Sequence, residues 1–253
     1  MRIIVAPAKK MRVDTDSLPC DGLPALLDRT RRLRDWVQGL SFEEKKRLWG
    51  CSDTIARRAA EDFDHMDLEH ELTPALIAYD GIQYSYMAPD VFDQDELAYV
   101  REHLRILSGF YGVLRPFDGV VPYRLELENK AAVDGHRNLY EFWGDAIYRT
   151  VMDGNDDATI INLASQQYAR IVERHLQPND RFVTCVFGEL VGDRVVQRGV
   201  YAKMARGEMV RHLASIGAED TEQLLSFVWS DYRYDEARST ATSYVFVRAG
   251  DKG

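Results

Sequence analysis

LRILSGFYGVLRPFDGVVPYRLE, residues Leu104–Glu126, joins an apolar, helix-like start to a loop rich in glycine, proline, arginine and aromatic residues. Apolar residues recur at helical spacing from Leu97 to Leu107, which predicts an amphipathic helix over 95–107. Ser108-Gly109 would end this helix, because glycine readily takes the left-handed conformation found at helix C-termini. The loop that follows suits either a ligand-binding role for its cations and rings or a packed Ω-loop whose aromatic side chains cover the core.

Several segments of the chain resemble the bacterial peroxide-stress protein YaaA family. Besides Leu104–Glu126, the matching segments are IIVAPAKK (Ile3–Lys10), LYEFWGD (Leu139–Asp145), INLAS (Ile161–Ser165) and YAKMARG (Tyr201–Gly207). The first is similar to the family's N-terminal "SPAK" signature, with Ala6 in place of the commoner serine. These segments occur in the expected order and span nearly the whole chain.

The resemblance implies a cytoplasmic protein that protects DNA during hydrogen peroxide exposure and limits free intracellular iron. It also implies duplex-DNA binding, a positively lined cleft and an element like the helix-hairpin-helix of repair enzymes. In such an element one apolar residue separates two glycines, whereas two residues separate Gly109 from Gly112 here. The resemblance implies no particular reaction.

The composition is that of one globular domain over residues 1–253, either compact throughout or with two lobes that face a basic cleft. The chain is 45% hydrophobic and 29% charged, and no linker-like or low-complexity tract interrupts it. The N-terminal apolar run is too short for a signal peptide, and no stretch approaches a membrane span, so we expect a cytoplasmic protein without a membrane partner. The three cysteines form no CxxC pair and are expected to be reduced.

The net charge of −9 argues against a generic polyanion binder, but the charge is uneven. Residues 101–124 carry four arginines against two acids, and residues 198–212 carry three arginines and one lysine against one acid. If these two segments face each other, an acidic protein can present one positive cleft to a phosphate-bearing partner. If they lie apart, they are solvated faces.

Strand and helix patterns intermix along the chain, which predicts an α+β or α/β fold with a mixed sheet. The expected strands are 3–6, 75–79, 159–163, 182–186, 195–201 and 244–247. The expected helices are a hairpin over 23–63, with a capping box at Ser41 and Glu44, and single helices over 95–107, from Asn138, over 165–176 and over 202–216. No dinucleotide-binding or P-loop motif is present.

Cations follow two of the expected strands. Lys203 and Arg206 would lie in the first turn of a helix, where the helix dipole disfavours cations, so we interpret them as an anion site. The alternative is a helix that begins near Gly207 and leaves both as surface charges. Lys9 follows the first strand, where ligands of open sheets bind, and suits phosphate pairing, a lysine nucleophile or base, or a plain surface role. The resemblance favours Lys9 over Lys10, because Lys9 aligns with the lysine of the family signature.

Other candidate side chains lie near the same strand ends. Asn162 is either a contact to a base or sugar or a structural turn amide, and Ser165 is most simply a helix N-cap. Glu126 is the best candidate for a general acid or base, unless it only pairs with Arg124. The remaining candidates for nucleic-acid or anion binding are Arg105, Arg115 and Tyr123.

These residues support two main functional hypotheses, and neither includes a cofactor or a metal site. The first is DNA binding in peroxide defence, with the basic cleft on the phosphates of a duplex, preferably open or distorted, and Phe110, Tyr111 or Tyr123 stacked on unpaired bases. The second is an enzyme acting on a nucleotide or flipped nucleobase, with Lys9 or Glu126 as catalytic residue. A third is a non-catalytic interaction protein that binds a stress-response partner.

Overall fold

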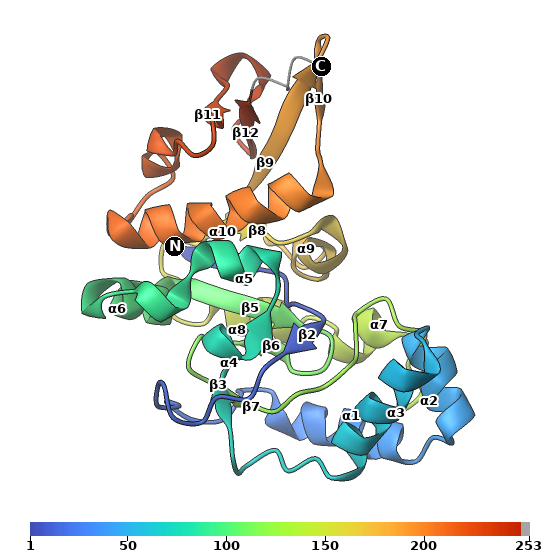
Figure 1. The fold of residues 1–253 in the computed structure, drawn as a ribbon. Helices are drawn as coiled ribbons and strands as arrows, with labels where there is room; N and C mark the ends of the chain where they lie inside the picture. Colours follow the sequence, from blue (N-terminus) through green and yellow to red (C-terminus); the bar gives the residue numbers. More distant parts are fainter. Residues whose placement is uncertain (249–253) are drawn as a thin grey trace.

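A mixed, mostly parallel β-sheet from distant parts of the chain forms the centre of the fold (Figure 1). A computed structural model describes residues 1–248. The parallel strands lie in the order β5, β1, β8, β9, β12. Their bounds are Leu104–Ser108, Arg2–Val5, Thr159–Leu163, Arg181–Val191 and Ser243–Arg248. Antiparallel strands extend the sheet: β6 (Gly112–Leu114) on β5, β11 (Arg233–Tyr234) on β12 and β10 (Arg194–Val196) on β9.

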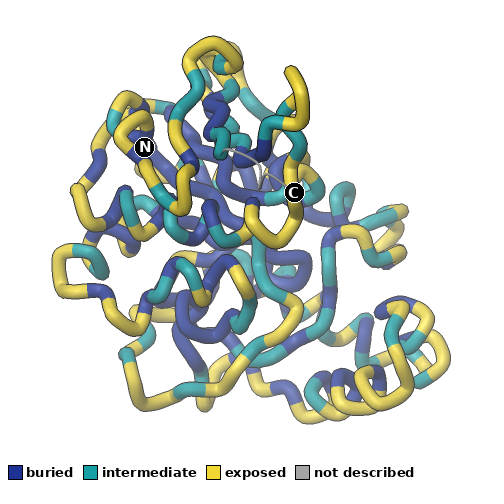
Figure 2. Tube along the Cα trace, turned by 45° about the horizontal axis from the view of Figure 1, so that its top comes forward, coloured by how far each residue is buried: buried dark blue, intermediate teal, exposed yellow. Residues whose placement is uncertain are grey.

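The central strands are apolar because helices and loops cover both faces of the sheet. Every residue of β1 and β8 is buried, and Figure 2 shows this buried centre surrounded by exposed loops. In the register between them, Ile4 lies opposite Asn162 and Val5 opposite Leu163. The predicted strands over 3–6 and 159–163 are therefore confirmed, as is the mixed sheet of an α/β fold.

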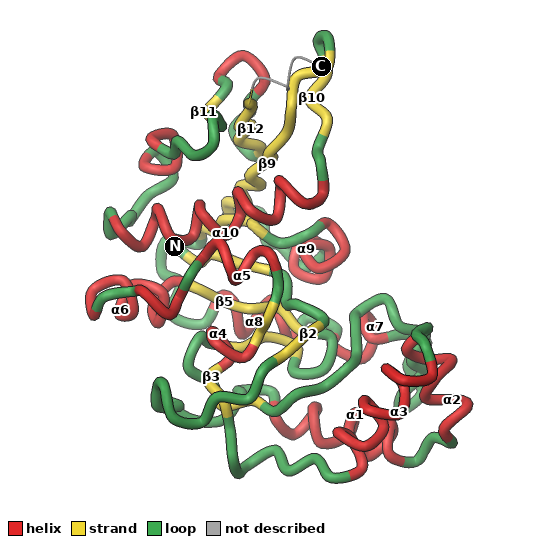
Figure 3. The backbone as a smooth tube through the Cα atoms, viewed as in Figure 1, coloured by secondary structure: helices red, strands yellow, loops and turns green. Residues whose placement is uncertain are grey.

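Helices α1, α2 and α3 form a group beyond the β6 side of the sheet (Figure 3). They span Leu27–Gln38, Phe42–Trp49 and Asp53–Asp64. Helix α2 begins at the predicted capping box, in which Ser41 and Glu44 satisfy each other's backbone amides, and ends at Gly50 with φ of 56°.

The remaining helices pack against the sheet. Helix α10 (Gly199–Ser215) contacts α5 (Ile82–Met87), α6 (Gln94–His103) and β9, while α8 (Ala146–Met152) contacts β6 and α9 (Gln166–Glu173). The helix predicted from Asn138 is divided at Gly144 into α7 (Leu139–Trp143) and α8. The smaller elements are β2 (Lys10–Met11) paired with β4 (Tyr79–Asp80), β3 (Thr73–Pro74) paired with β7 (Gly119–Val120), α4 (Ala75–Ala78), and 3-10 turns at Pro89–Val91, Gln223–Ser226 and Glu236–Arg238.

The helix predicted over 95–107 is wrong in its second half. Helix α6 ends at His103, and Leu104–Ser108 forms the buried strand β5. A short apolar run fits either periodicity, and pairing with β1 decides for the strand. The two glycines that follow belong to the turn of the β5–β6 hairpin, so this segment is not a helix-hairpin-helix.

Two predicted strands also change. Residues 75–78 form the short helix α4, and only Tyr79–Asp80 is extended. The strand predicted over 195–201 stops at Val196, and α10 begins at Gly199. Lys203 and Arg206 therefore lie beyond the first turn of α10, and the helix-dipole reason for an anion site there does not hold.

Gly207 brings α10 unusually close to α5. A Cβ atom at this position would lie 2.1 Å from the backbone carbonyl oxygen of Gln83 and 2.8 Å from the backbone nitrogen of Met87. Because both neighbours are backbone atoms, a side chain at position 207 would force the helices apart.

We predict that Gly207→Ala lowers the free energy of unfolding by about 1–3 kcal/mol, the usual cost of overpacking a buried contact. The matched control is Gly199→Ala in the same helix, where nothing lies within 4 Å of the added carbon. The control should be neutral or more stable by about 0.5 kcal/mol, because alanine restricts the unfolded chain. Urea denaturation of both variants measures the difference, and equal stabilities would contradict the close contact.

Candidate functional site

The most promising site lies where the order of the sheet reverses. From β1 the sheet continues to β5 on one side and to β8 on the other, so the carboxyl ends of β1 and β8 meet at a topological switch point. Open α/β sheets bind ligands in the crevice at such points. Here a cavity of about 470 Å³ is lined by the segments that follow β1 and β8, and we call it the switch-point pocket.

Candidate charged side chains from three separate segments reach the switch-point pocket. Lys9 comes from the loop after β1, Glu126 from the loop after β7, and Lys203 and Arg206 from α10. Two of these cations, Lys9 and Lys203, are exposed, while Arg206 is half-buried. The structure therefore brings together four residues selected from the sequence, although they span nearly 200 positions.

The buried donors of this pocket lack partners. Within residues 1–248 the Nε–H of Arg206 and the side-chain amide N–H of Gln83 donate to no hydrogen-bond partner, and Gln83 is only 7% exposed. Burial lowers the pKa of the Arg206 guanidinium. Buried polar groups in native proteins are nearly always hydrogen-bonded, so these two atoms are exceptions, and both of their side chains line the cavity.

Glu126 supplies a negative group to the pocket, besides Asp80, which pairs with Lys10. The hydroxyl of Tyr168 donates a 2.8 Å hydrogen bond to its carboxylate, and the backbone amide of Glu126 donates to the side chain of Asn129 at 2.6 Å. Burial, and then the nearby Glu126 charge, raise the pKa of Tyr168 well above its ordinary value, so this hydroxyl remains a donor. Arg124, the alternative partner predicted for Glu126, lines a different cavity.

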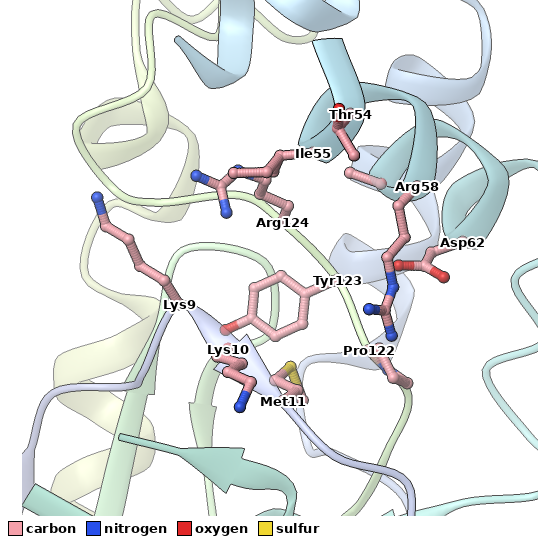
Figure 4. A pocket seen from close by; sticks show the side chains of 11 residues that line it. Lys9, Lys10, Met11, Thr54, Ile55, Arg58, Asp62, Pro122, Tyr123 and Arg124 are labelled. Carbon is pink, nitrogen blue, oxygen red and sulfur yellow. The ribbon is translucent and has the colours of Figure 1, made fainter. Parts of the chain in front are cut away.

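That second cavity adjoins the first and has a volume of about 420 Å³ (Figure 4). Tyr123 and Arg124 line it together with residues of α3, and we call it the Tyr123 pocket. Figure 4 shows Lys9 and Arg124 projecting to the same side, away from Asp62 of α3. Lys9 and Lys10 line both pockets, so the two hollows form one continuous surface that we call the trough.

A directed chain of hydroxyl groups holds Tyr123 in place. The Oγ of Ser108 accepts hydrogen bonds from the backbone amides of Phe110 and Tyr111, at 3.1 and 2.9 Å. Its own hydrogen is then directed to the Tyr123 oxygen at 2.7 Å, and the Tyr123 hydroxyl donates to Tyr79 at 2.9 Å. Burial raises the pKa of Tyr123 well above its ordinary value, which keeps the chain protonated.

The other aromatic residues of this segment do not reach a surface. Phe110 and Tyr111 are 0% and 1% exposed and pack in the core against Tyr123. The prediction that they stack on bases is wrong, because no base can contact their rings. The packed-loop alternative describes them correctly.

Two predicted cations also lie away from the trough. Arg105 is 4% exposed, and its guanidinium donates to the backbone oxygens of Glu102 and Leu104 at 3.0 and 2.7 Å. Burial lowers its pKa to about 10. Arg115 is exposed but lines neither pocket and lies 3.7 Å from the Asp153 carboxylate. Arg105 is thus a structural donor, and Arg115 belongs to another surface.

Of the two candidates in the INLAS segment, Ser165 lines the pocket and Asn162 does not. Asn162 is 3% exposed, accepts a hydrogen bond from the backbone amide of Ala164 at 2.9 Å and donates to Thr184 at 3.2 Å. This is the structural turn amide that was the alternative to a base contact. Ser165 stands at the N-cap of α9 but makes no side-chain cap hydrogen bond, and it lines the switch-point pocket.

The sequence did not indicate Gln83 or Tyr168 as site residues. Tyr168 has the helical spacing of a core residue, and Gln83 follows a turn without any motif. Gly81 was a usable signal, because a Cβ there would lie 2.8 Å from the Cβ of Ala8, which brings these two loops together.

The described part of the chain has neither a cluster of metal ligands nor a membrane-spanning helix. Among residues 1–248, no group of three or more histidine, cysteine, aspartate or glutamate side chains is arranged to hold a metal ion. In the same residues no helix combines the length and the apolar character needed to cross a membrane.

We predict that Ser108→Ala lowers the free energy of unfolding by about 1–3 kcal/mol, because it leaves two buried backbone amides and the Tyr123 oxygen without their partner. Ser215→Ala is the matched control, since this exposed serine bonds only to its own helix, and its change should stay within about 0.5 kcal/mol. Thermal and urea denaturation measure both. A neutral Ser108→Ala would show that the hydroxyl chain does not stabilise the site.

Comparison with known proteins identifies the family. Residues 1–238 match the family described as peroxide stress protein YaaA. A UPF0246 protein of Desulfitobacterium hafniense is 49% identical over 98% of both chains. UPF0246 proteins of Lachnoclostridium phytofermentans and Pediococcus pentosaceus are each 46% identical over 98% of this chain and over 96% and 98% of their own lengths. With its sheet, its trough and this likeness over nearly its full length, the chain belongs to the peroxide stress protein YaaA family.

Proposed function

We propose that this member of the family acts in the cytoplasm during peroxide stress and binds DNA along the trough. The observation that carries the proposal is the meeting of Lys9, Arg124 and Lys203 along one hollow surface of an acidic protein. In the part of the chain that the structure describes, none of these three cations forms an ion pair. Six cations line the trough against the three carboxylates of Asp62, Asp80 and Glu126, and a concave surface with such an excess of positive charge concentrates the field on a phosphate backbone.

Several cations elsewhere on the surface have carboxylate partners. Arg12 pairs with Asp90, Arg101 with Asp21 and Arg149 with Asp145, at 2.7 to 2.9 Å. Among the trough residues that the structure describes, Lys10 is the one cation in an ion pair, with Asp80 at 2.5 Å. The other cations of the trough are gathered in one hollow without carboxylate partners, which supports a polyanionic partner.

The shape of the trough favours an open or distorted duplex over an intact one. Its two hollows of about 420 and 470 Å³ are each in the range of small-ligand pockets, roughly 300–1,000 Å³. One separated strand can enter such hollows, with its phosphates on the cations. The limitation of free iron, which the family resemblance implied, stays a prediction to which the geometry assigns no residues.

We predict that Arg124→Glu/Lys203→Glu weakens DNA binding at least about tenfold at 0.1 M salt and makes the dependence of log affinity on log salt shallower by about 1.5, since each lost phosphate contact removes roughly 0.7–0.9. The charge-matched control is Arg115→Glu/Arg149→Glu, which lies outside both pockets. Fluorescence anisotropy with bubble-containing and intact duplexes measures the effect. Equal losses in the two double variants would reject the trough as the binding surface.

Catalysis on a nucleotide or flipped base is a second candidate, and Glu126 is the observation that favours it. Its carboxylate shares the switch-point pocket with Lys9 and is oriented by the Tyr168 hydroxyl. Such a carboxylate suits a general base that takes a proton from a water molecule. The water oxygen then bonds to the anomeric carbon of the sugar, the bond from this carbon to the nucleobase breaks, and the nucleobase leaves with the bonding electrons.

If the protein is an enzyme of this kind, Glu126→Gln should lower turnover about 10²–10⁴-fold and leave DNA affinity within a few-fold of the unaltered protein. Mass spectrometry of nucleotides and of damaged oligonucleotides incubated with the protein would detect a released base or phosphate. The absence of any product from the unaltered protein would leave binding without catalysis.

A further inference from the structure

The α10 side of the switch-point pocket contains a guanidinium prepared for a ligand. Arg206 is half-buried, its buried Nε has no hydrogen-bond partner among residues 1–248, and the guanidinium forms no ion pair within them. Across the helix contact, Gln83 is buried with its amide nitrogen equally unpartnered. Unpaired donors are costly in a protein interior. These two nitrogen atoms are themselves closed to solvent, but both side chains line the cavity, and the terminal nitrogens of Arg206 form no hydrogen bond among residues 1–248, which leaves the end of this guanidinium available to a ligand.

The backbone holds these two donors together. Gly207 follows Arg206 directly, and its contact with the Gln83 carbonyl brings the two helices to backbone distance. Lys203 lies three residues before Arg206 on the same helix and therefore on a neighbouring part of its surface. The pocket thus has two cations on α10 and one amide donor on α5. The direct backbone contact between the two helices at Gly207 fixes their relative position.

The chemistry of this wall selects a phosphate monoester. A guanidinium offers a planar pair of donors that matches two oxygens of a carboxylate or a phosphate. Two neighbouring cations favour a group with about two negative charges, which a phosphate monoester carries at neutral pH and a carboxylate does not. An internal phosphodiester of DNA carries one charge, so the best match is a terminal phosphate or a free nucleotide.

The rest of the pocket has room and groups for a nucleoside. At about 470 Å³ the cavity exceeds what a phosphate alone would fill. Ile82 lines the cavity and is 37% exposed, which offers an apolar surface to a base, while Glu126 offers an acceptor to N–H or O–H groups. Apolar walls with a few convergent polar groups are typical of small-ligand sites.

We propose that the switch-point pocket binds one nucleoside monophosphate, with the phosphate on Arg206 and Lys203 and the nucleoside between Ile82 and Glu126. The ligand is either a free mononucleotide or the phosphorylated end of a DNA strand. This inference rests on the proposed function, because a strand lying in the trough would place its end in this pocket.

The first experiment compares ligands on the full chain by isothermal titration calorimetry. The four deoxynucleoside monophosphates, their nucleosides and inorganic phosphate are titrated separately. At least one nucleotide should bind tenfold or more tightly than its nucleoside and than phosphate. If every nucleotide fails to bind at millimolar concentration, or if phosphate alone binds equally well, the inference is overturned.

Arg206→Met tests the residue, because methionine retains an unbranched apolar stem and removes the charge. Nucleotide affinity should fall at least tenfold, and Lys203→Gln, a change at an exposed position, should lower it severalfold. Arg149→Gln on α8 is the control and should change nothing. If Arg206→Met does not fold, as judged by circular dichroism, Lys203→Gln decides alone, and unchanged nucleotide affinity in it would overturn the assignment.

Oligonucleotides with phosphorylated and with hydroxyl ends distinguish the two ligand sources. Tighter binding of the phosphorylated strand, lost in Arg206→Met, supports strand ends, while nucleotide binding without this gain supports free nucleotides. Failure of the DNA proposal would give a different result. The Arg124→Glu/Lys203→Glu variant would then bind hydroxyl-ended strands with the same affinity as the unaltered protein. DNA binding that is sensitive to the trough variants, together with no nucleotide binding, would overturn the pocket inference alone.

Discussion

The parallel pairing of β1 on both of its edges is the constraint on which the structure depends. A strand with neighbours on both sides and cover on both faces must be apolar throughout, and β1 is fully buried. Its pairing also fixes where the chain leaves the sheet, at Ala6-Pro7 beside the end of β8. The switch-point pocket follows from this arrangement, because the loops after β1 and β8 must diverge to opposite sides of the sheet.

The α10–α5 contact then turns this crevice into a charged pocket. Without the approach at Gly207, Arg206 and Gln83 would not share a wall. The acidic composition of the protein is compatible with the free cations of the trough, because surface cations such as Arg12, Arg101 and Arg149 have carboxylate partners. A net charge of −9 therefore says little about the local field in the trough.

The sequence predicted what depends on short-range patterns. Strands β1 and β8 follow from continuous apolar runs, and the start of α2 follows from the capping pair Ser41 and Glu44. The segment Leu104–Ser108 was misassigned because apolar spacing in a short run fits a helix and a strand equally well, and only pairing with β1 distinguishes them.

The candidate site was predictable in part, for reasons that differ between residues. Lys9 was found because it directly follows a recognisable strand. Lys203 and Arg206 were selected for their place in a helix that in fact begins earlier, at Gly199. Gln83 and Tyr168 were missed because their roles arise from packing between elements that no local pattern relates.

The strand order has a consequence for how the protein is made. On the ribosome β1 emerges first, yet its partners β5 and β8 begin at residues 104 and 159, and β12 is completed only at residue 248. Both edges of the apolar strand β1 therefore stay unpaired until β5 and β8 have been synthesised, and such long-range pairings form slowly. Nascent chains of this protein are thus exposed to aggregation for longer than chains whose first strand finds a neighbour at once.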